Sequence, residues 1–407
     1  MIEEYKKEKS TNLTINVQAD EINEIREVTL EKNSTRIFKD GKIFSANYLG
    51  KVENDDLKKN ALENTYGSLE FDYSLNDSVV NQSSFGKKLR DLDVVDLTKD
   101  LLSHFQKNLP DFIYSGKVDY NEVDTNLVVS SGIDIKQTES SVEGFLIMKR
   151  KGSPNIMDSA LGFSIGDGNI DLSNFDNFID LHKKFDNVVD VKSGRSPVIF
   201  VSEKDFLQKF SQSLSPESYH QGSAYYSDKL GEKLFNEKVN LVDVRVDESD
   251  GLFNIYDSEG EKLSPELPLI ENGVFKNIFY DKNMAKKYKA TSTGNGKREF
   301  NSSVFPRAYH LDFVAGDKTY KELVASFEKV IVIIMAGGGD TTTNGDYSSP
   351  VQVGFVVENG NVVGRTPEIT ISGNIDQMMG EDFIAISSDK FYPTRSHSFM
   401  CHMNIIK

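Results

Sequence analysis

The chain has 407 residues, of which 38% are hydrophobic and 27% are charged, and its formal net charge is −16. This length allows two or three domains with a sizeable core, and the acidic balance argues against tight binding to nucleic acid or to an anionic membrane. No apolar run approaches the roughly 20 residues of a membrane span, and the charged start "MIEEYKKEKSTN" lacks the apolar core of a signal peptide.

The first predicted elements are strands and two helices. Residues 13–49 are expected to form strands, because "LTINV" alternates apolar and polar positions and Asp40-Gly41 separates two strand-like runs. Helices are expected over residues 54–66 and 94–109. The second has its apolar residues on one face and Pro110 as its stop.

Strands are expected again at 126–137 and 141–152, followed by a helix over 173–190. This first region therefore mixes helices with antiparallel hairpins and lacks a repeating βα rhythm. The inward-facing residues of the third helix are predicted to be Phe175, Phe178, Leu181 and Phe185.

A second region opens with "KSGRSPVIF" and a short predicted helix, "SEKDFLQKFSQSL", capped by Ser202. From about residue 239 the chain is strand-like, which suggests long hairpins. The sequence thus predicts an α+β fold: a mixed domain over 1–190 and a strand-rich domain over 191–407. Its turn signals are Asp250-Gly251, Glu259-Gly260, Asn272-Gly273, Asn359-Gly360 and Gly373-Asn374.

Two glycine patterns could suggest chemistry. The cluster in "IVIIMAGGGDTTTNGDYSSPVQVGFVV" lacks the lysine and spacing of a P-loop, and Thr342 stands where a dinucleotide fingerprint needs glycine. We interpret it as a turn between core strands. "GFSIG" at 162–166 matches the nucleophile elbow, but that motif needs a helix directly after the serine, and "GDGNID" indicates a turn. We interpret it as a glycine-rich strand or loop.

The histidines and the single cysteine give little sign of a metal site. No H-E-x-x-H motif is present, and His104 and His182 lie on predicted helices without a histidine four residues on. In a strand near the end, Cys401 and His397 would share one face and His402 would lie on the other. Two possible ligands on one face, His397 and Cys401, are weak evidence for a zinc site. A single cysteine excludes an intrachain disulfide and fits a reducing cytoplasm.

An ordered series of polar and glycine-rich stretches resembles the TldD/PmbA family, also called the TldD/TldE or modulator-of-gyrase family. The resemblance covers nearly the whole chain and is strongest from about 220 to 383. The stretches are "SAYYSDKLGEKLF" (223–235), "YDSEG" (256–260), "PLIENGVFKNIFYDKNMAKKY" (268–288), "TSTGNGKR" (291–298), "VENGNVV" (357–363), "ISGNI" (371–375) and "MMGEDF", with Gly380 and Asp382.

The resemblance implies cytoplasmic dimers with a link to peptide proteolysis. Its active branch is similar to zinc peptidases with an H-E-x-x-x-H helix and a later cysteine ligand. Here the helix after "SPVIF" has no histidine, and its Glu203 and Asp205 alone are poor zinc ligands. The segment after "MMGEDF", "IAISSDKFYPTRSH", has no cysteine. We therefore expect a PmbA/TldE-like chain with no catalytic residue, metal or cofactor of its own, inactive alone.

The first hypothesis is a subunit that helps a TldD-like zinc peptidase hold an extended peptide by strand pairing. The alternative is a metal-free peptide-binding or scaffold homodimer. A third hypothesis is an enzyme that uses His397 with Cys401, and a fourth, direct action on a DNA enzyme, is disfavoured by the charge. The predicted peptide-binding residues are Ser292, Thr293, Gly294, Ser372, Gly373 and Asn374, with Asp257 and Ser258 as weaker candidates that could simply form a turn.

Overall fold

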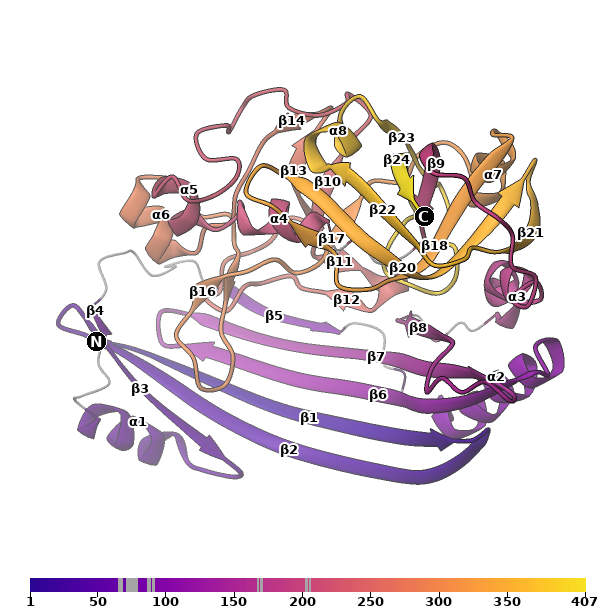
Figure 1. Cartoon of the computed structure of the whole chain (residues 1–407). Helices are drawn as coiled ribbons and strands as arrows, with labels where there is room; N and C mark the ends of the chain where they lie inside the picture. Colours follow the sequence, from indigo (N-terminus) through magenta and orange to yellow (C-terminus); the bar gives the residue numbers. More distant parts are fainter. Residues whose placement is uncertain are drawn as a thin grey trace.

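The computed structural model describes residues 1–64, 69–70, 80–85, 89, 92–166, 168, 171–201, 204 and 206–407. Figure 1 shows long N-terminal strands forming one broad sheet, with the C-terminal part lying over it. Helices and mainly antiparallel sheets together confirm the predicted α+β class. No helix within these described ranges is long and apolar enough to cross a membrane.

The N-terminal sheet has the strand order β4-β3-β2-β1-β6-β7-β5, and β8 also pairs with β7. Its pairs are antiparallel except β5 with β7. The strands are β1 (Ile2–Gln18), β2 (Glu21–Lys39), β3 (Lys42–Leu49), β4 (Leu69–Glu70), β5 (Val80–Phe85), β6 (Phe112–Val129), β7 (Ile133–Arg150) and β8 (Ser159–Ile165).

Two tight turns fold back the first strands. The predicted hairpin at Asp40-Gly41 is confirmed: it joins β2 to β3, and φ is 53° and 71° at the two residues. Positive φ at both central positions is the requirement of a type I′ turn. The turn from β1 to β2 at Ala19-Asp20 also has positive φ at both residues, 48° and 74°. This turn contains no glycine, and it was not predicted.

The predicted helix over 94–109 is confirmed as α2 (Val94–Asn108), which packs against β6. The side chain of Asp93 accepts hydrogen bonds from the first turn, and Leu101 and Phe105 are completely buried. The helix predicted over 54–66 is α1 (Asn54–Glu63). Its last predicted residues, 65–66, lie outside the described residues.

The helix predicted over 173–190 is shorter than expected. A 3₁₀ turn, η2 (Leu172–Phe175), leads into α3 (Asp176–His182). The chain then leaves the helix because Val188 and Val189 pair with Arg365 of a distant strand. The four residues predicted to face inward are all buried, which confirms that part of the prediction: Phe175, Phe178, Leu181 and Phe185.

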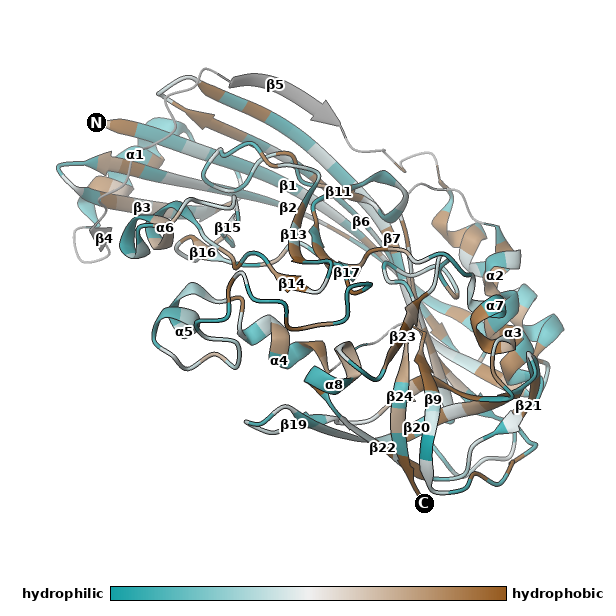
Figure 2. Ribbon diagram, turned by 90° about the horizontal axis from the view of Figure 1, so that it is seen from above, coloured by the Kyte–Doolittle hydropathy of each residue, from teal (hydrophilic) through white to brown (hydrophobic). Residues whose placement is uncertain are grey.

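The C-terminal part is built around a closed, barrel-like sheet. Its strands follow the order β18-β9-β24-β22-β20, and β20 pairs back onto β18. Figure 2 shows hydrophobic stretches along β23 and β24. The strands are β9 (Gly194–Phe200), β18 (Lys329–Ala336), β19 (Asp340–Thr341), β20 (Asp346–Glu358), β21 (Asn361–Arg365), β22 (Ile369–Asn374), β23 (Phe383–Ile386) and β24 (Phe399–Ile406).

Shorter elements surround this barrel. A four-stranded sheet has the order β14-β13-β10-β17, and β11–β12 and β15–β16 are separate pairs. These strands are β10 (Leu241–Val244), β11 (Val246–Asp247), β12 (Leu252–Phe253), β13 (Glu266–Glu271), β14 (Val274–Phe275), β15 (Gly296–Lys297), β16 (Phe305–Pro306) and β17 (Leu311–Phe313). The helices are α4 (Leu207–Gln212), α5 (Pro216–His220), η3 (Glu248–Asp250), α6 (Lys282–Tyr288), α7 (Tyr320–Ala325) and α8 (Ile375–Met379).

Most of the predicted turns are present in this part. Asn272-Gly273 joins β13 to β14 and Asn359-Gly360 joins β20 to β21, with positive φ at all four residues. The glycines at 337–339 follow β18 and precede β20, which confirms a turn between strands. The prediction at Gly373-Asn374 is wrong: both residues lie in β22. Asn374 caps α8 through its side chain, so the signal marked a helix start.

The two parts of the chain share a core. The largest cluster of buried apolar residues includes Phe178 from α3 and Phe355 from β20. The predicted boundary at residue 190 lies between α3 and β9, at the start of the second sheet. Because the core extends across it, the division into 1–190 and 191–407 stays a prediction.

A buried ion cluster also joins the two parts. Glu4 accepts two hydrogen bonds from Arg36, at 2.8 and 2.6 Å, and forms an ion pair with Arg298 at 3.0 Å. Arg298 also donates to Ser34 Oγ at 2.7 Å, and Arg36 donates to the carbonyl of Ser258 at 3.2 Å. The cluster therefore ties β1 and β2 to the loops of the C-terminal part.

Gly166, directly after β8, allows a close backbone approach between the two parts. A Cβ atom built on it would lie 1.7 Å from the amide nitrogen of Gly251. We expect Gly166→Ala to lower the free energy of unfolding by about 2 kcal/mol or more, because the two backbones would have to separate. Urea denaturation measures this.

Gly162, within β8, is the matched control, since a Cβ there would meet nothing closer than 3.7 Å. Gly162→Ala is expected to change the free energy of unfolding by less than about 1 kcal/mol. Equal effects of the two substitutions would contradict the role given to Gly166.

Candidate functional site

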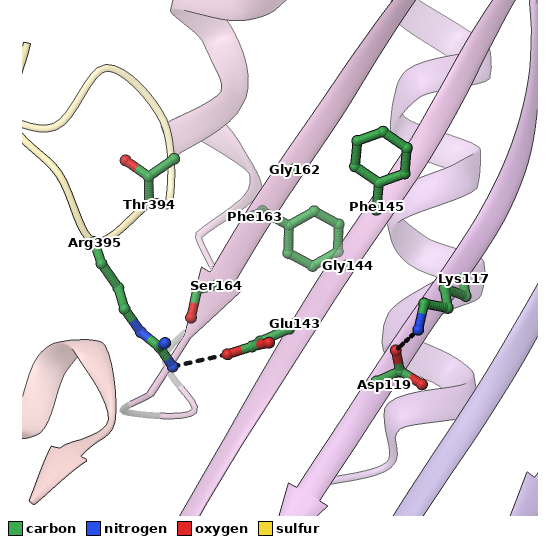
Figure 3. Close-up of a pocket in the computed structure, with 10 residues that line it drawn as sticks. All are labelled: Lys117, Asp119, Glu143, Gly144, Phe145, Gly162, Phe163, Ser164, Thr394 and Arg395. Atoms are coloured by element: carbon green, nitrogen blue, oxygen red, sulfur yellow. Dashed lines mark ion pairs between the residues drawn. The ribbon is translucent and has the colours of Figure 1, made fainter. Parts of the chain in front are cut away.

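A cleft runs between the N-terminal sheet and the C-terminal part, around the loop of residues 393–397. Three adjoining cavities of about 400, 390 and 440 Å³ all have Thr394 in their walls. Figure 3 shows the first, where Thr394 and Arg395 face Glu143 and Ser164 of the sheet. Each volume is within the range of about 300–1,000 Å³ that is usual for ligand sites. We call these three cavities together the Thr394 cleft.

The loop that lines this cleft is held from both sides. Arg395 forms an ion pair with Glu143 of β7 at 2.9 Å, and its Nε donates to the carbonyl of Asp250 at 3.1 Å. The carbonyl oxygen of Arg395 lies 2.8 Å from Nε2 of His310. These contacts fix the loop, so its side chains present a defined surface to the cleft.

His397, one of the residues weighed as a zinc ligand, is fixed by an acid. Its Nδ1 lies 2.8 Å from Oδ2 of Asp312, and its backbone N–H points at the same carboxylate. The strand on which the shared-face argument depended begins only at Phe399. Cys401 is completely buried in the core, and this burial, together with the charge of Asp382, raises the pKa of its thiol. The predicted common face of His397 and Cys401 is therefore not formed.

The helix predicted over 202–214 is present in part: α4 covers Leu207–Gln212, and its N-cap residue is Phe206 and not the predicted Ser202. The apolar residues of the predicted helix are all buried: Phe206, Leu207, Phe210 and Leu214. Ser202, Glu203 and Asp205 lie outside the described residues. Lys204, just before the helix, lines the second cavity of the Thr394 cleft. Burial lowers the pKa of Lys204 to about 8, while the carboxylate of Asp312 acts in the opposite direction.

The described residues that line the cavity with Lys204 do not fit a zinc centre. Zinc in peptidases is held by imidazole, carboxylate or thiolate ligands, whereas an ammonium group repels the ion. Within the ranges that the structure describes, no three His, Cys, Asp or Glu side chains are grouped so that they could hold a metal ion. The polar side chains around Lys204 are Gln208, Ser211, Thr394 and Ser396.

The first group of predicted peptide-binding residues forms the loop after α6. The hydroxyl of Ser292 donates to Glu261 at 2.5 Å, and the hydroxyl of Thr293 accepts from the N–H of Tyr280 at 2.8 Å. Gly294 has φ of +70°, and a Cβ on it would lie 2.3 Å from the side chain of Leu263. All three residues therefore have structural partners within the C-terminal part.

Asp257 and Ser258 lie beside this loop, in a turn. Oδ1 of Asp257 accepts hydrogen bonds from the N–H groups of Glu259 and Glu261, both at 2.8 Å. The N–H of Ser258 donates to the carbonyl of Gly296 at 2.8 Å. The structure thus brings residues 257–258 next to the segment that follows 292–294.

The carboxyl group of Asp257 is unusual because its other oxygen, Oδ2, is buried and has no hydrogen-bond partner. A Cβ on Gly296 would lie 2.8 Å from Oε2 of Glu259 and 3.1 Å from Oδ2 of Asp257, so the two carboxyl groups converge there. Burial, followed by the charge of Glu259, raises the pKa of Asp257 to about 8. We therefore expect the pair of carboxyl groups, Asp257 and Glu259, to hold a proton at neutral pH.

The second group, Ser372, Gly373 and Asn374, lies on the barrel. Ser372 pairs with Ser348 of β20 on one side and with Asn404 of β24 on the other. An incoming peptide therefore finds no free edge at Ser372, which could contribute to a groove only through its side chain. The first group lies in a loop and the second in β22. None of the eight predicted residues lines the described walls of the Thr394 cleft. Their assignment stays a prediction.

Other residues that the sequence singled out have structural contacts. His182 is completely buried between Ser159 and the carbonyl of Phe178, and this burial lowers its pKa to about 4. His104 lies on α2 with its Nε2 buried and unpartnered. Ser164 of "GFSIG" is in β8, which confirms the strand interpretation, and its N–H donates to Pro393.

Sequence reasoning missed the residues that line the cleft. Lys204 and Arg395, which line it, carry no recognisable motif, and neither does Asp312, which holds His397. The three residues come from separate segments of the chain. The position of Lys204 in the first turn of the predicted helix was the one available signal.

Comparison with known proteins relates the chain to a single family. Residues 193–405 match the model of the "PmbA/TldA metallopeptidase C-terminal domain". An uncharacterised protein of Methanocaldococcus jannaschii is 24% identical over 364 residues, covering 85% of this chain and 82% of its own. A "Metalloprotease PmbA homolog" of Buchnera aphidicola is 28% identical over 203 residues, covering 49% of this chain and 43% of its own. The crystal structure of TldE from Thermococcus kodakarensis superposes with a TM-score of 0.83 at 20% identity, covering 100% of this chain and 96% of that one. At this identity the superposition establishes the fold alone.

Proposed function

Because the chain belongs to the PmbA/TldD metallopeptidase family, we propose that it is a PmbA/TldE-type subunit that binds an extended peptide without a zinc centre of its own. It acts in the cytoplasm beside a TldD-like zinc peptidase and contributes to peptide proteolysis or maturation. The partner supplies the metal, and with it the activated water that attacks the peptide bond.

The observation that carries this proposal is the character of the Thr394 cleft. It has the volume of a ligand site, and its loop is fixed to both parts of the chain by Arg395. In the wall that includes α4, the described residue directly before the helix is Lys204. Its side chain ends in an ammonium group, which repels a metal ion. Such a cleft can bind and orient a peptide, and in its described walls no three His, Cys, Asp or Glu side chains are grouped so that they could hold a metal ion.

Part of the cleft suits the backbone of an extended chain. In the first cavity the ion pairs Arg395–Glu143 and Lys117–Asp119, at 2.9 and 2.8 Å, frame an exposed Phe145 (Figure 3). Charged groups at the rim and an aromatic side chain between them can contact both the amides and the apolar side chains of a peptide. The eight residues predicted from the sequence form a second, separate candidate surface.

Co-purification with a TldD-like peptidase from the same host tests this function. We expect the isolated chain to contain no stoichiometric zinc and to leave unfolded peptides intact. The mixture is expected to form a complex in size-exclusion chromatography and to cleave them. Metal analysis of each fraction assigns the zinc. Zinc in the isolated chain, or peptide cleavage by it, would contradict the proposal.

A homodimer without a peptidase partner is the alternative. It predicts that labelled peptide binds to the isolated chain and that no TldD-like protein associates with it. The same chromatography experiment separates the two, because the complexes have different masses and only one contains zinc.

A further inference from the structure

The first cavity of the Thr394 cleft contains an aromatic ring that the fold leaves half exposed. Phe145 of β7 lines this cavity and is 47% exposed (Figure 3). Side chains alternate along a strand, so the next residue, Leu146, points to the opposite face of the sheet, where it is 1% exposed. A ligand that enters the cavity can cover the ring of Phe145, and the burial of this apolar surface favours binding.

The space beside this ring is left open by Gly162 of β8. Residues 145 and 162 are directly opposite each other in the β7–β8 pair, so a side chain at position 162 would lie next to Phe145 on the same face. A Cβ atom built on Gly162 would lie 3.7 Å from Cδ2 of Phe145 and 4.0 Å from the carbonyl oxygen of Gly144. There is thus room for a side chain that the sequence does not supply.

Neither backbone conformation nor close packing requires glycine at position 162. Its φ lies outside the left-handed region that favours glycine, and the two distances just given are ordinary van der Waals contacts. Gly144 on the neighbouring strand is different, because a Cβ atom there would lie 2.1 Å from the ring of Phe163. Packing therefore explains Gly144, whereas the effect of Gly162 is an open space beside Phe145.

The charged residues that line this cavity have partners within the protein. Lys117, opposite Phe145 on β6, forms an ion pair with Asp119 at 2.8 Å, and Arg395 forms one with Glu143 at 2.9 Å. A ligand beside the ring therefore does not have to neutralise these charges. The faces of an aromatic ring attract cations, and an aliphatic side chain lacks this attraction. An uncharged aromatic group is thus the ligand that these surroundings suit best.

We propose that the space beside Phe145 binds the side chain of an aromatic residue of the peptide. The inference rests on the proposed function, since it names the kind of side chain that the cleft recognises. The ring of the ligand lies over the backbone of Gly162 and packs against Phe145 in an offset or edge-to-face arrangement. Its faces are presented to the cationic groups of Lys117 and Arg395 at the rim.

Isothermal titration calorimetry with three unlabelled peptides tests this on the full chain. The peptides are capped at both ends, have no charged residues, and differ at one central position, which is Phe, Leu or Ala. We expect the Phe peptide to bind about threefold or more tightly than the Leu peptide, because only Phe forms a ring–ring contact. It should bind about tenfold more tightly than the Ala peptide, which buries the least apolar surface.

Two substitutions alter the site in different ways. Phe145→Ala removes the ring and is expected to abolish the preference for Phe over Leu. Gly162→Leu fills the space with a side chain of the protein itself and is expected to reduce the affinity for the Phe peptide to that for the Ala peptide. Leu30→Ala is the matched control, because Leu30 of β2 is 46% exposed and does not line the described walls of the cleft. It should keep the preference.

Thermal unfolding verifies that each variant is folded, and either substitution at the site is sufficient for the test. Equal affinity of the wild type for the Phe and Leu peptides would overturn the inference and leave peptide binding in place. A preference that is unchanged in the folded site variants would do the same. If the wild-type chain binds none of the three peptides, alone or with its zinc partner, the proposed function is wrong as well.

Discussion

Replacing Glu4 by Gln is expected to lower the free energy of unfolding at pH 7 by about 3–5 kcal/mol. Glu4 is the common counter-charge of Arg36 and Arg298, and all three side chains are almost fully buried. Without it, two guanidinium groups stay buried with no carboxylate between them. Urea denaturation, followed by circular dichroism, measures the loss.

The pH dependence of this loss follows from the pKa of Glu4. Burial alone would raise it, but the charges of Arg36 and Arg298 outweigh burial and lower it below 4.5. A lowered carboxyl pKa stabilises the folded state above the unfolded value and ceases to do so as pH falls through the folded value. The difference between wild type and Glu4→Gln should therefore be full at pH 7 and shrink in acid.

Glu8 provides the control on the same strand. It forms ion pairs with Lys6 and Lys32 at 3.2 and 3.0 Å, and 22% of its side chain is exposed. We expect Glu8→Gln to cost less than about 1 kcal/mol. If Glu4→Gln cost no more than this, the buried cluster would not be what ties the two parts together.

The second large effect concerns Asp257, whose substitution by Asn should flatten the dependence of stability on pH. In the folded state Asp257 keeps its proton up to a pKa of about 8, compared with 3.8 as its ordinary value. Between these values the folded state binds more protons than the unfolded state, so stability falls as pH rises. We expect this group to contribute a loss of about 1 kcal/mol per pH unit between pH 5 and 8.

Asn at position 257 retains an oxygen for the N–H groups of Glu259 and Glu261 and adds an N–H donor beside the carboxylate of Glu259. Chemical denaturation at pH 5, 6.5 and 8 gives the slope of the free energy of unfolding against pH for Asp257→Asn and for the wild type. Glu248→Gln, an exposed acid in a nearby turn, should keep the wild-type slope. An equal slope in Asp257→Asn would show that Asp257 is ionised in the folded protein.

Local patterns in the sequence were enough for the elements that depend on neighbours along the chain. The apolar face of α2, its stop at Pro110 and the hairpin at Asp40-Gly41 were predicted correctly. Each is determined by a few adjacent residues, through side-chain spacing or backbone conformation. The family, too, could be identified, since the ordered motifs lie within the matched segment 193–405 or next to it.

Features that depend on distant partners could not be predicted in this way. The helix at 173–190 ends early because Val188 and Val189 pair with Arg365, and nothing local indicates that strand. The ion pair of Arg395 with Glu143 and the field of Asp312 on Lys204 also join separate segments. For the candidate site, sequence motifs pointed to residues 257–258, 292–294 and 372–374, whereas the cleft is assembled from loops without a motif.

The closed order of the barrel has a consequence for biosynthesis. β9 lies between β18 and β24, so it is made long before either of the strands that flank it. During synthesis the apolar segment Val198–Phe200 stays unpaired until β18 and β24 have emerged from the ribosome. Loop-closure entropy makes such late pairing slow, and in that interval the nascent chain presents an open strand of the kind that chaperones protect from aggregation.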